Sequence, residues 1–519
     1  MDQAGAAAAA GAMGAAPLTE ATSPQKAPES HPDRVPAVAW LIAAVFVALE
    51  LALSGRYGFM QDELYFIEAG RHLAFGYVDQ PPLTPLADKL TDVLGVTPTA
   101  VRVVPALAGG AVVVLAARFA ALFGAGTLGR VIAALLTACT PVLLSSDHLG
   151  NTTPLDLLTW PVVGLCVAVA LLRGRPRWWL GGGVAAGIGL ENDNLMLLLL
   201  ICLALGILAS KYRRVLGTPW PWLGAGIAAV LWAPNVVWQA THGWPELSMA
   251  SALHQENSTA GNYIGGLPDQ VVALGVLAFP LGVVGFVVLW RRPELRFLAV
   301  ASTLILVYVL AWVPGKGYYT FGIAPELLAA GAVAAERWIA RARRPRLRTA
   351  AVAAAPLAGL VLMPLYLPVV PVADVHSLPS SAQHLSNLGD TIGWPQLVSA
   401  VAAQDAALAR AGQPPTSIFT GAYGEAGALD VLGSGYRLPP VLSGHNAYWM
   451  WGPGQASDRT VLVVDALGQL RPYFASCRLL TTFNPPYHVQ NDWTDLQIGV
   501  CTGPVAKWNV IWPHLRHYD

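Results

Sequence analysis

Two adjacent carboxylates are the residues in this chain best placed to do chemistry. Asp62 and Glu63 lie in the segment 57–65, directly after the first long apolar stretch. A charged side chain at a membrane face is costly unless it is paired or used. A carboxylate there can act as a general base that removes a proton from a hydroxyl group, which accelerates a reaction by about 10² to 10⁴. We therefore treat this segment as the first candidate for a catalytic site.

The two carboxylates are not equally good candidates for the general base. We favour Asp62 as the base, with a helix cap as its alternative. Glu63 has two open interpretations. It could raise the proton affinity of Asp62 or orient an acceptor, or it could be the acidic first-turn residue of an amphipathic helix over residues 64–73.

The composition is that of a membrane protein, whose helices must position these residues. Hydrophobic residues make up 55% of the 519 residues and charged residues only 12%, whereas soluble proteins average about 25% charged residues. The formal net charge is +0, so the chain has no overall basic field to attract nucleic acid. We expect an integral membrane protein and no nucleic-acid partner.

Apolar stretches predict about eleven transmembrane helices, because one crossing needs about 20 apolar residues. The predicted spans are 36–54, 100–123, 128–146, 154–172, 178–192, 194–209, 219–238, 269–290, 296–313, 319–339 and 349–370. The two crossings between 178 and 209 are short and surround the polar segment 191–194.

Charge asymmetry predicts the orientation, because Lys and Arg favour cytoplasmic loops. With an even number of crossings between residues 178 and 209, the basic clusters at 173–177, 211–214, 291–296 and 337–348 all fall on one face. This predicts a multi-pass protein of the plasma (cytoplasmic) membrane, with a disordered cytoplasmic tail at 1–34 and a transmembrane domain at 35–371. The first outer loop, 55–99, then faces away from the cytoplasm.

Residues 372–519 change in character and predict an extracytoplasmic α/β domain. Helical spacing covers 393–411, a short helix covers 424–432, and strands are expected at 417–420, 460–464, 479–483 and 496–500. Only Cys477 and Cys501 lie in this domain, and an outside location favours a disulfide bond between them over two free thiols. Cys139, Cys166 and Cys202 fall within predicted spans, where a thiol behaves as a small apolar group.

Several short motifs follow one another in an order typical of one enzyme family. Segments 59–65, 76–83, 153–158, 242–245 and 315–319 resemble the family 39 type glycosyltransferases of the GT-C superfamily, which include protein O-mannosyltransferases and the lipid A aminoarabinose transferase. The resemblance spans about residues 36–370. It implies an inverting glycosyltransferase that moves a sugar from a polyprenyl-phosphate donor to an acceptor hydroxyl at the outer membrane face. Asp62 matches the catalytic aspartate of the family.

The resemblance leaves the donor sugar and the acceptor open. The acceptor could be a glycan, a lipid or a protein. The abundance of Ala, Gly, Pro and Arg hints at a GC-rich bacterial genome, which favours a bacterial polyprenyl phosphate over dolichol.

The phosphate partner differs from the family pattern. The family often has a Lys directly before the Pro pair of the first loop, and this chain has Gln80 there. A leaving phosphate needs nearby positive charge or hydrogen-bond donors, so we expect Lys316 to take this role, beside Tyr318 and Tyr319. Arg71 and Arg102 are further candidates. Lys316 could instead be an interfacial lysine, and Arg102 could extend to lipid headgroups.

Candidates for holding the sugar or the acceptor lie in several loops and in the C-terminal domain. Asp156 is unfavourable just inside a span unless it has a partner, and Asp193 stands where the family often has Lys. Aromatic and amide groups in the C-terminal domain suit a carbohydrate, but they could equally anchor the domain to the membrane surface. The candidates are Asp79, Gln80, Asp156, His242, Glu425, His445, Asn446 and Trp449, with Trp451 beside them.

The sequence identifies no cofactor with certainty and leaves open whether a metal is needed. Asp79, Asp147 and His148 lack the spacing of a metal site, so a divalent metal is the minor alternative. A transporter or flippase for lipid-linked sugars is the competing function, although the polar residues gather at one surface and no internal repeat is visible. A scaffold or sensor with a glycan-binding outer domain is a third possibility.

Overall fold

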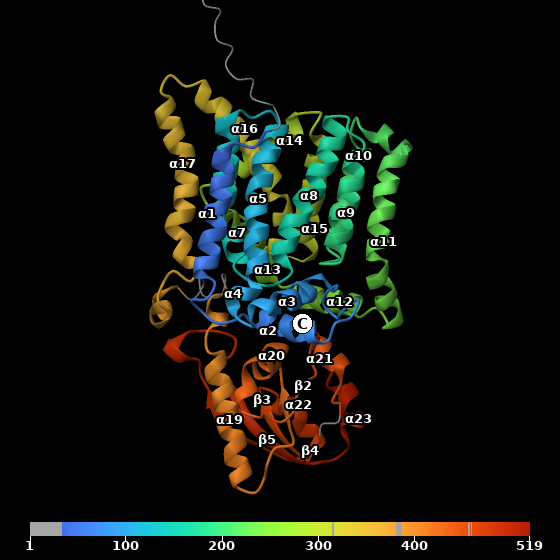
Figure 1. Ribbon diagram of the computed structural model, residues 1–519, viewed down its shortest axis with the longest axis vertical. Helices are drawn as coiled ribbons and strands as arrows, with labels where there is room; N and C mark the ends of the chain where they lie inside the picture. The colour runs from blue at the N-terminus through green and yellow to red at the C-terminus, as the bar shows by residue number, and fades with distance from the viewer. Residues whose placement is uncertain (1–33, 314–315, 380–386, 455–456, 458, 519) are drawn as a thin grey trace, which may run out of the picture.

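A helical bundle carries a small sheet domain at one end, and short helices lie between the two parts (Figure 1). The computed structural model describes residues 34–313, 316–379, 387–454, 457 and 459–518. The tail expected at 1–34 therefore falls outside the described residues except for Arg34. Gly315, the first residue of the 315–319 motif, and Pro314 before it also fall outside them.

Apolar helices build the bundle in the order expected from the sequence. Their bounds are α1 (Ala37–Leu53), α5 (Val103–Leu122), α6 (Thr127–Ala138), α7 (Pro141–Ser146), α8 (Thr153–Leu172), α9 (Trp178–Leu190), α10 (Met196–Leu208), α11 (Pro219–Thr241), α13 (Ala260–Leu274), α14 (Phe279–Arg291), α15 (Arg296–Trp312), α16 (Ala324–Ala340) and α17 (Pro345–Leu362).

Four of the described helices are long and apolar enough to cross a membrane alone. They are Pro98–Leu122, Thr153–Leu172, Pro219–Thr241 and Pro345–Leu365. Shorter apolar helices fill most of the remaining predicted spans, so the number of crossings stays a prediction.

Two predicted spans are interrupted in the structure. The span 128–146 is divided into α6 and α7, and the span 269–290 is divided into α13 and α14, which are bent by 100°. Gly275 ends α13 with a φ of +90°, a conformation that glycine adopts readily. The sequence pattern missed both breaks because apolarity alone does not report a change of direction.

Glycines let some of the bundle helices approach one another at backbone distance. A Cβ atom added at Gly285 of α14 would lie 1.9 Å from the carbonyl oxygen of Leu327 in α16. Association of helices within a membrane relies on such close packing of small residues. The tight α14–α16 contact fixes the start of α16, next to the segment that carries Lys316.

Four short helices lie between the bundle and the C-terminal domain (Figure 1). They are α2 (Gln61–Arg71), α3 (Leu83–Thr91), α4 (Pro98–Val101) and α12 (Pro245–Asn257). On α3, Leu86 and Leu90 are exposed, as expected for an amphipathic helix that lies on a bilayer surface.

The C-terminal domain is an α/β unit with a mixed five-stranded sheet in the order β2-β1-β3-β5-β4. Strands β1 (Ser417–Thr420), β2 (Val441–Ser443) and β3 (Thr460–Val464) run parallel, while β5 (Leu496–Pro504) pairs antiparallel with β3 and with β4 (Phe474–Phe483). The helices are α19 (Trp394–Arg410), α20 (Tyr423–Leu432), α21 (Asn446–Trp451), α22 (Leu467–Leu470) and α23 (Trp508–Ile511). The strand β2 was not predicted because three residues are too few to form a recognisable apolar run.

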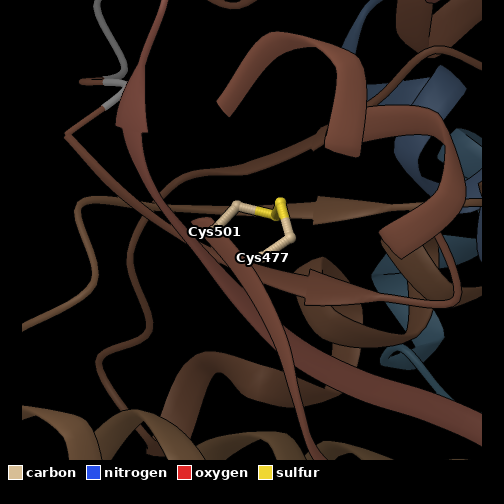
Figure 2. Close-up of a disulfide and its surroundings, with 2 residues drawn as sticks. All are labelled: Cys477 and Cys501. Carbon is tan, nitrogen blue, oxygen red and sulfur yellow. A yellow bond between two sulfur atoms is a disulfide. The ribbon is translucent and has the colours of Figure 1, made fainter. Parts of the chain in front are cut away.

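A disulfide bond joins Cys477 of β4 to Cys501 of β5, which face each other in the sheet (Figure 2). This is the pairing that the sequence favours. Cys139, Cys166 and Cys202 are free and buried in the bundle.

Candidate active site

A polar cavity of about 450 Å³ lies where the bundle meets the C-terminal domain. The turns between bundle helices, the start of α2 and the start of α20 all contribute to its wall. Its polar lining residues are Gln61, Asp62, Ser145, Ser146, Asn151, Thr153, Asp269, Lys316, Tyr318, Tyr366, Asn387 and Tyr423.

Asp62 enters this cavity from the first turn of α2. Its Oδ1 accepts a hydrogen bond of 2.9 Å from the hydroxyl of Tyr423, and Asn151 also hydrogen-bonds to its carboxylate. Burial raises the pKa of Asp62 above its usual value, although the Tyr423 hydrogen bond and the charge of Lys316 act in the opposite direction. Asp62 is therefore a more basic carboxylate than a free Asp, on the wall of a cavity that can admit a substrate.

Glu63 points into the protein, where its carboxylate forms a buried ion pair. Its carboxylate binds Arg102 through two hydrogen bonds of 2.7 and 2.8 Å and also accepts the backbone N–H groups of Met60 and Gly150 at 2.8 Å each. This geometry favours the interpretation of Glu63 as a first-turn helix acid over a catalytic role.

The guanidinium of Arg102 is likewise hydrogen-bonded within the protein. Besides Glu63, its guanidinium donates to the carbonyl oxygens of Ser54 and Gly58 at 2.6 and 2.8 Å, and the residue is only 1% exposed. The interpretation that Arg102 extends to lipid headgroups is therefore wrong. Four of its five N–H donors are used within the protein, and the buried side chain is not accessible to a phosphate.

Lys316 lines the same cavity as Asp62, next to the short helix η3 (Gly317–Ile323). Tyr318 shares this wall, and its ring lies 4.7 Å from the ring of Tyr319. Arg71 is different, because it lies at the far end of α2, about 14 Å along the helix from Asp62, and forms an ion pair of 2.7 Å with Glu68. The structure thus brings Lys316, and not Arg71, to the cavity that holds Asp62.

A small polar recess adjoins the cavity and shares Thr153 and Tyr318 with it. The recess has a volume of about 20 Å³ and contains Asp156 and Asp193. Asn192 donates a hydrogen bond of 2.9 Å to Asp156, and Asp156 and Asp193 line the recess together. The space admits about one water-sized group.

Asp79 and Gln80 lie near the site without lining the cavity. Asp79 accepts a hydrogen bond of 2.7 Å from Tyr65, and burial raises its pKa to about 7. Gln80 is 3% exposed, and its backbone oxygen accepts the N–H of Tyr77 at 2.9 Å. Asp79 therefore orders the first loop through Tyr65, while Gln80 shapes its turn.

His242 lies outside the cavity on an exposed surface. Its Nδ1 is 2.8 Å from the carbonyl oxygen of Trp238, and its ring stacks on the Trp238 ring at 4.2 Å. These contacts are those of a helix end, since His242 directly follows α11.

Glu425 and Trp449 of the C-terminal domain make contacts within that domain, whereas the ring of Trp451 stacks on the ring of His72, after α2, at 4.5 Å. Glu425 accepts the N–H of Ala422 at 3.0 Å in the first turn of α20, and burial raises its pKa to about 8. Trp449 donates to the carbonyl oxygen of Trp512 at 3.0 Å. These contacts support the domain's own fold, which gives both residues a structural role.

His445 and Asn446 are buried close to the final segment of the chain. The Nδ1 of His445 accepts the N–H of Tyr423 at 3.3 Å, and the N–H of Asn446 donates to the carbonyl oxygen of His517 at 3.2 Å. His445 therefore reaches the cavity only indirectly, through Tyr423.

Asp147 and His148 are buried on the bundle side of the site. The Nδ1 of His148 lies 2.9 Å from the Oε2 of Glu50 in α1. In the part of the chain that the structure describes, no group of three His, Cys, Asp or Glu residues is arranged to hold a metal ion.

Sequence reasoning missed Tyr423, which lies in the segment 420–425, two residues before the candidate Glu425. The segment follows β1 directly and opens α20, as the carboxyl end of a parallel strand often does at a ligand site. That signal marks a functional edge of the sheet, but nothing local indicates that the tyrosine reaches Asp62.

Comparisons with known proteins agree with this architecture. Residues 79–238 match the family model described as dolichyl-phosphate-mannose-protein mannosyltransferase. The crystal structure of ArnT from Cupriavidus metallidurans in the apo state is similar with a TM-score of 0.58 and 14% identity, over 89% of this chain and 98% of that chain. This chain has the fold of the GT-C membrane glycosyltransferases. The fold predicted from the ordered motifs, a polytopic helical GT-C unit with a C-terminal α/β domain, is confirmed.

A second GT-C structure supports the same conclusion. ArnT from Cupriavidus metallidurans bound to undecaprenyl phosphate matches with a TM-score of 0.54 and 15% identity, over 90% of this chain and 98% of that chain. No curated protein matches the sequence significantly.

Proposed function

We propose that this protein transfers a sugar from a polyprenyl-phosphate donor to an acceptor hydroxyl, with Asp62 as the general base. One observation carries the proposal: Asp62 and Lys316 face the same cavity in a GT-C fold. A carboxylate and an ammonium group across one cavity are the two charges that such a transfer needs, one at the attacking oxygen and one at the leaving phosphate.

In the proposed step, Asp62 takes the proton from the acceptor hydroxyl as its oxygen attacks the anomeric carbon. The bond from that carbon to the phosphate oxygen breaks on the opposite side, so the sugar's configuration is inverted. Lys316 stabilises the negative charge that develops on the leaving polyprenyl phosphate. Tyr318, beside Lys316 in the cavity wall, can donate a further hydrogen bond to the phosphate.

The lipid nature of the donor is supported by a related structure. ArnT has been determined with undecaprenyl phosphate bound, and its fold covers most of this chain. We propose a donor of the same chemical class here. Gln80 stands where the family often has a lysine, and Lys316 supplies the positive charge in its place.

The recess beside the cavity is our proposed site for one polar group of the donor sugar. Asp156 and Asp193 can accept hydrogen bonds from a sugar hydroxyl, and Tyr318 connects the recess to the cavity. Because the recess has room for about one water-sized group, it can bind one substituent of the sugar but not the whole ring.

Several loops that the sequence predicts to be cytoplasmic contact one another at the end of the bundle away from the cavity, which supports an orientation for the protein. Arg130 donates to the carbonyl oxygen of Arg34, Arg292 donates to that of Phe123, and Glu336 accepts the N–H of Gly126. The connection between α16 and α17 lies at the same end in Figure 1, opposite the C-terminal domain. Since Lys and Arg favour the cytoplasmic side, we propose that the cavity opens at the outer face.

The test is turnover by the purified protein with a panel of undecaprenyl-phosphate sugars and alcohol acceptors. Wild-type protein should release undecaprenyl phosphate, and Asp62→Asn should lower the rate by about 10² to 10⁴. Asp92→Asn, a partly exposed carboxylate paired with Lys89, is the matched control and should keep full activity.

Two results would count against the proposal. Undiminished turnover in Asp62→Asn would remove Asp62 from the mechanism. Movement of the lipid-linked sugar across proteoliposomes without its release would indicate a transporter instead.

A further inference from the structure

The carboxylate proposed as the base is held by a residue from the other domain. Tyr423 is the first residue of α20, and its hydroxyl donates to Oδ1 of Asp62 at 2.9 Å across a separation of 361 positions. Both side chains line the polar cavity. The contact therefore lies inside the candidate site and not at its edge.

The position of the Tyr423 side chain is fixed from both sides. Its ring lies 4.8 Å from the ring of Tyr65 in α2 and 4.6 Å from the ring of His445 in the C-terminal domain. Its backbone N–H donates to Nδ1 of His445 at 3.3 Å. A tyrosine held in this way has little freedom to move its hydroxyl away from Asp62.

Two glycines bring α20 close enough to α2 for this contact. A Cβ atom at Gly424 would lie 2.7 Å from Cβ of Gln61, and one at Gly427 would lie 2.9 Å from the carbonyl carbon of Leu64. Such separations are too short for real side chains, so the spacing of the two helices depends on glycine at both positions.

We infer that Tyr423 is a positioning residue of the transfer site, so that the C-terminal domain supplies one part of it. This inference rests on the proposed function of Asp62. The hydrogen bond to Oδ1 fixes the rotation of the carboxylate, which faces the cavity where the acceptor hydroxyl would lie. It also stabilises the ionised form of Asp62, which is the form that can act as a base.

The charged and polar groups around Asp62 come from several elements. Lys316 faces it across the cavity, Asn151 hydrogen-bonds to it, and Asp269 of α13 lines the same wall. Further carboxylates that influence the site electrostatically are Glu63, Asp79 and Asp390. Glu63 is already paired with Arg102.

The sign of the effect follows from these surroundings. Burial raises the pKa of Asp62, while the Tyr423 hydrogen bond and Lys316 lower it. Loss of the Tyr423 hydroxyl removes one of the two main influences that favour the ionised form. Asp62 should then stay protonated to a higher pH.

The experiment measures the protonation of Asp62 directly in the full-length protein. Dicyclohexylcarbodiimide modifies protonated carboxyl groups in apolar surroundings, and mass spectrometry of the peptide that contains Asp62 gives the extent of labelling at each pH. In Tyr423→Phe the midpoint of labelling should move up by about one pH unit. Tyr448→Phe is the matched control, because its hydroxyl donates to Asp430 at 2.9 Å and not to Asp62, and its midpoint should equal that of wild type.

A second variant tests the same hydrogen bond in the opposite direction. Incorporation of 3-fluorotyrosine at position 423 keeps the ring and gives a more acidic phenol, which donates more strongly and should lower the midpoint. Equal midpoints in wild type, Tyr423→Phe and the fluorinated protein would overturn the inference.

The turnover assay separates this inference from the proposed function. If transfer occurs, the acidic limb of the pH–rate profile should move up with the labelling midpoint in Tyr423→Phe, with little change in KM for the lipid donor. If wild-type protein transfers no sugar at any pH, the proposed function fails, whereas a shifted labelling midpoint still supports Tyr423 as the residue that holds Asp62.

Discussion

Two neighbouring carboxylates have opposite surroundings because they lie in one helical turn. Successive residues of an α-helix point about 100° apart, so Asp62 faces the cavity while Glu63 faces Arg102 in the protein interior. Residue type and spacing could not separate their roles. The contacts do, because one carboxylate has room for a substrate beside it and the other has all its hydrogen-bonding positions occupied by the protein.

The different surroundings predict different phenotypes for matched amide substitutions. Glu63→Gln leaves Arg102 buried without its counter-charge, so the free energy of unfolding should fall by about 3 to 5 kcal/mol. Asp62→Asn should unfold at nearly the wild-type denaturant concentration. Denaturant unfolding in detergent, followed by tryptophan fluorescence, measures both.

A double variant serves as the control for this prediction. Glu63→Gln combined with Arg102→Met should recover part of the lost stability, because the uncompensated charge is gone. Wild-type stability in Glu63→Gln, together with lost turnover, would restore the catalytic interpretation of Glu63.

At the scale of elements, the site depends on how closely α2 and α20 approach. Gly427 lies inside α20, where replacing glycine by alanine would ordinarily stabilise a helix by about 0.5 to 1 kcal/mol. Here the added Cβ would meet the backbone of Leu64 at 2.9 Å. Helix propensity and tertiary packing therefore predict opposite changes in the free energy of unfolding. The backbone contact should have the larger effect, because backbone atoms cannot move aside as a flexible side chain can.

Gly427→Ala should therefore destabilise the protein by about 1 to 3 kcal/mol and weaken the contact between Tyr423 and Asp62. Thermal unfolding and hydrogen exchange of the peptide covering α2 measure the two effects. Gly468→Ala in α22 is the control, since a Cβ there has no neighbour within 4 Å. A stability increase in Gly427→Ala would show that the α2–α20 contact is looser than described.

At the scale of the whole molecule, the position of the C-terminal domain decides which face of the membrane the site serves. The domain reaches Asp62 through Tyr423, whereas the basic connections lie at the other end of the bundle. The side of the membrane on which the domain lies is therefore also the side of the cavity.

Labelling with a membrane-impermeant maleimide in intact cells tests this orientation. Gln413→Cys, exposed in the C-terminal domain, should react from outside, and Arg175→Cys, exposed between α8 and α9, should react only after the membrane is opened. Wild-type protein should stay unlabelled, because its free cysteines are buried and the other two are paired. The reverse pattern would place the cavity in the cytoplasm and contradict the proposed function.

Much of the fold was predictable because it depends on local composition. Long apolar stretches give the bundle helices, and short continuous apolar runs give strands β1 and β3 near their observed bounds. The break between α13 and α14 was not predictable, since the apolar pattern continues through it. The three-residue strand β2 was also missed, because its pairing with β1 depends on a partner elsewhere in the chain.

The membrane class, the order of the motifs and the candidacy of Asp62 and Lys316 could be read from the residues alone, because each of these depends on residue types within a short stretch. The fold was needed to find that Glu63 and Arg102 neutralise each other, that Asp156 and Asp193 share a recess, and that Tyr423 holds Asp62. The reason is physical. Apolar periodicity selects which face of a helix is buried but not which partner buries it, and contacts between distant segments depend on that choice.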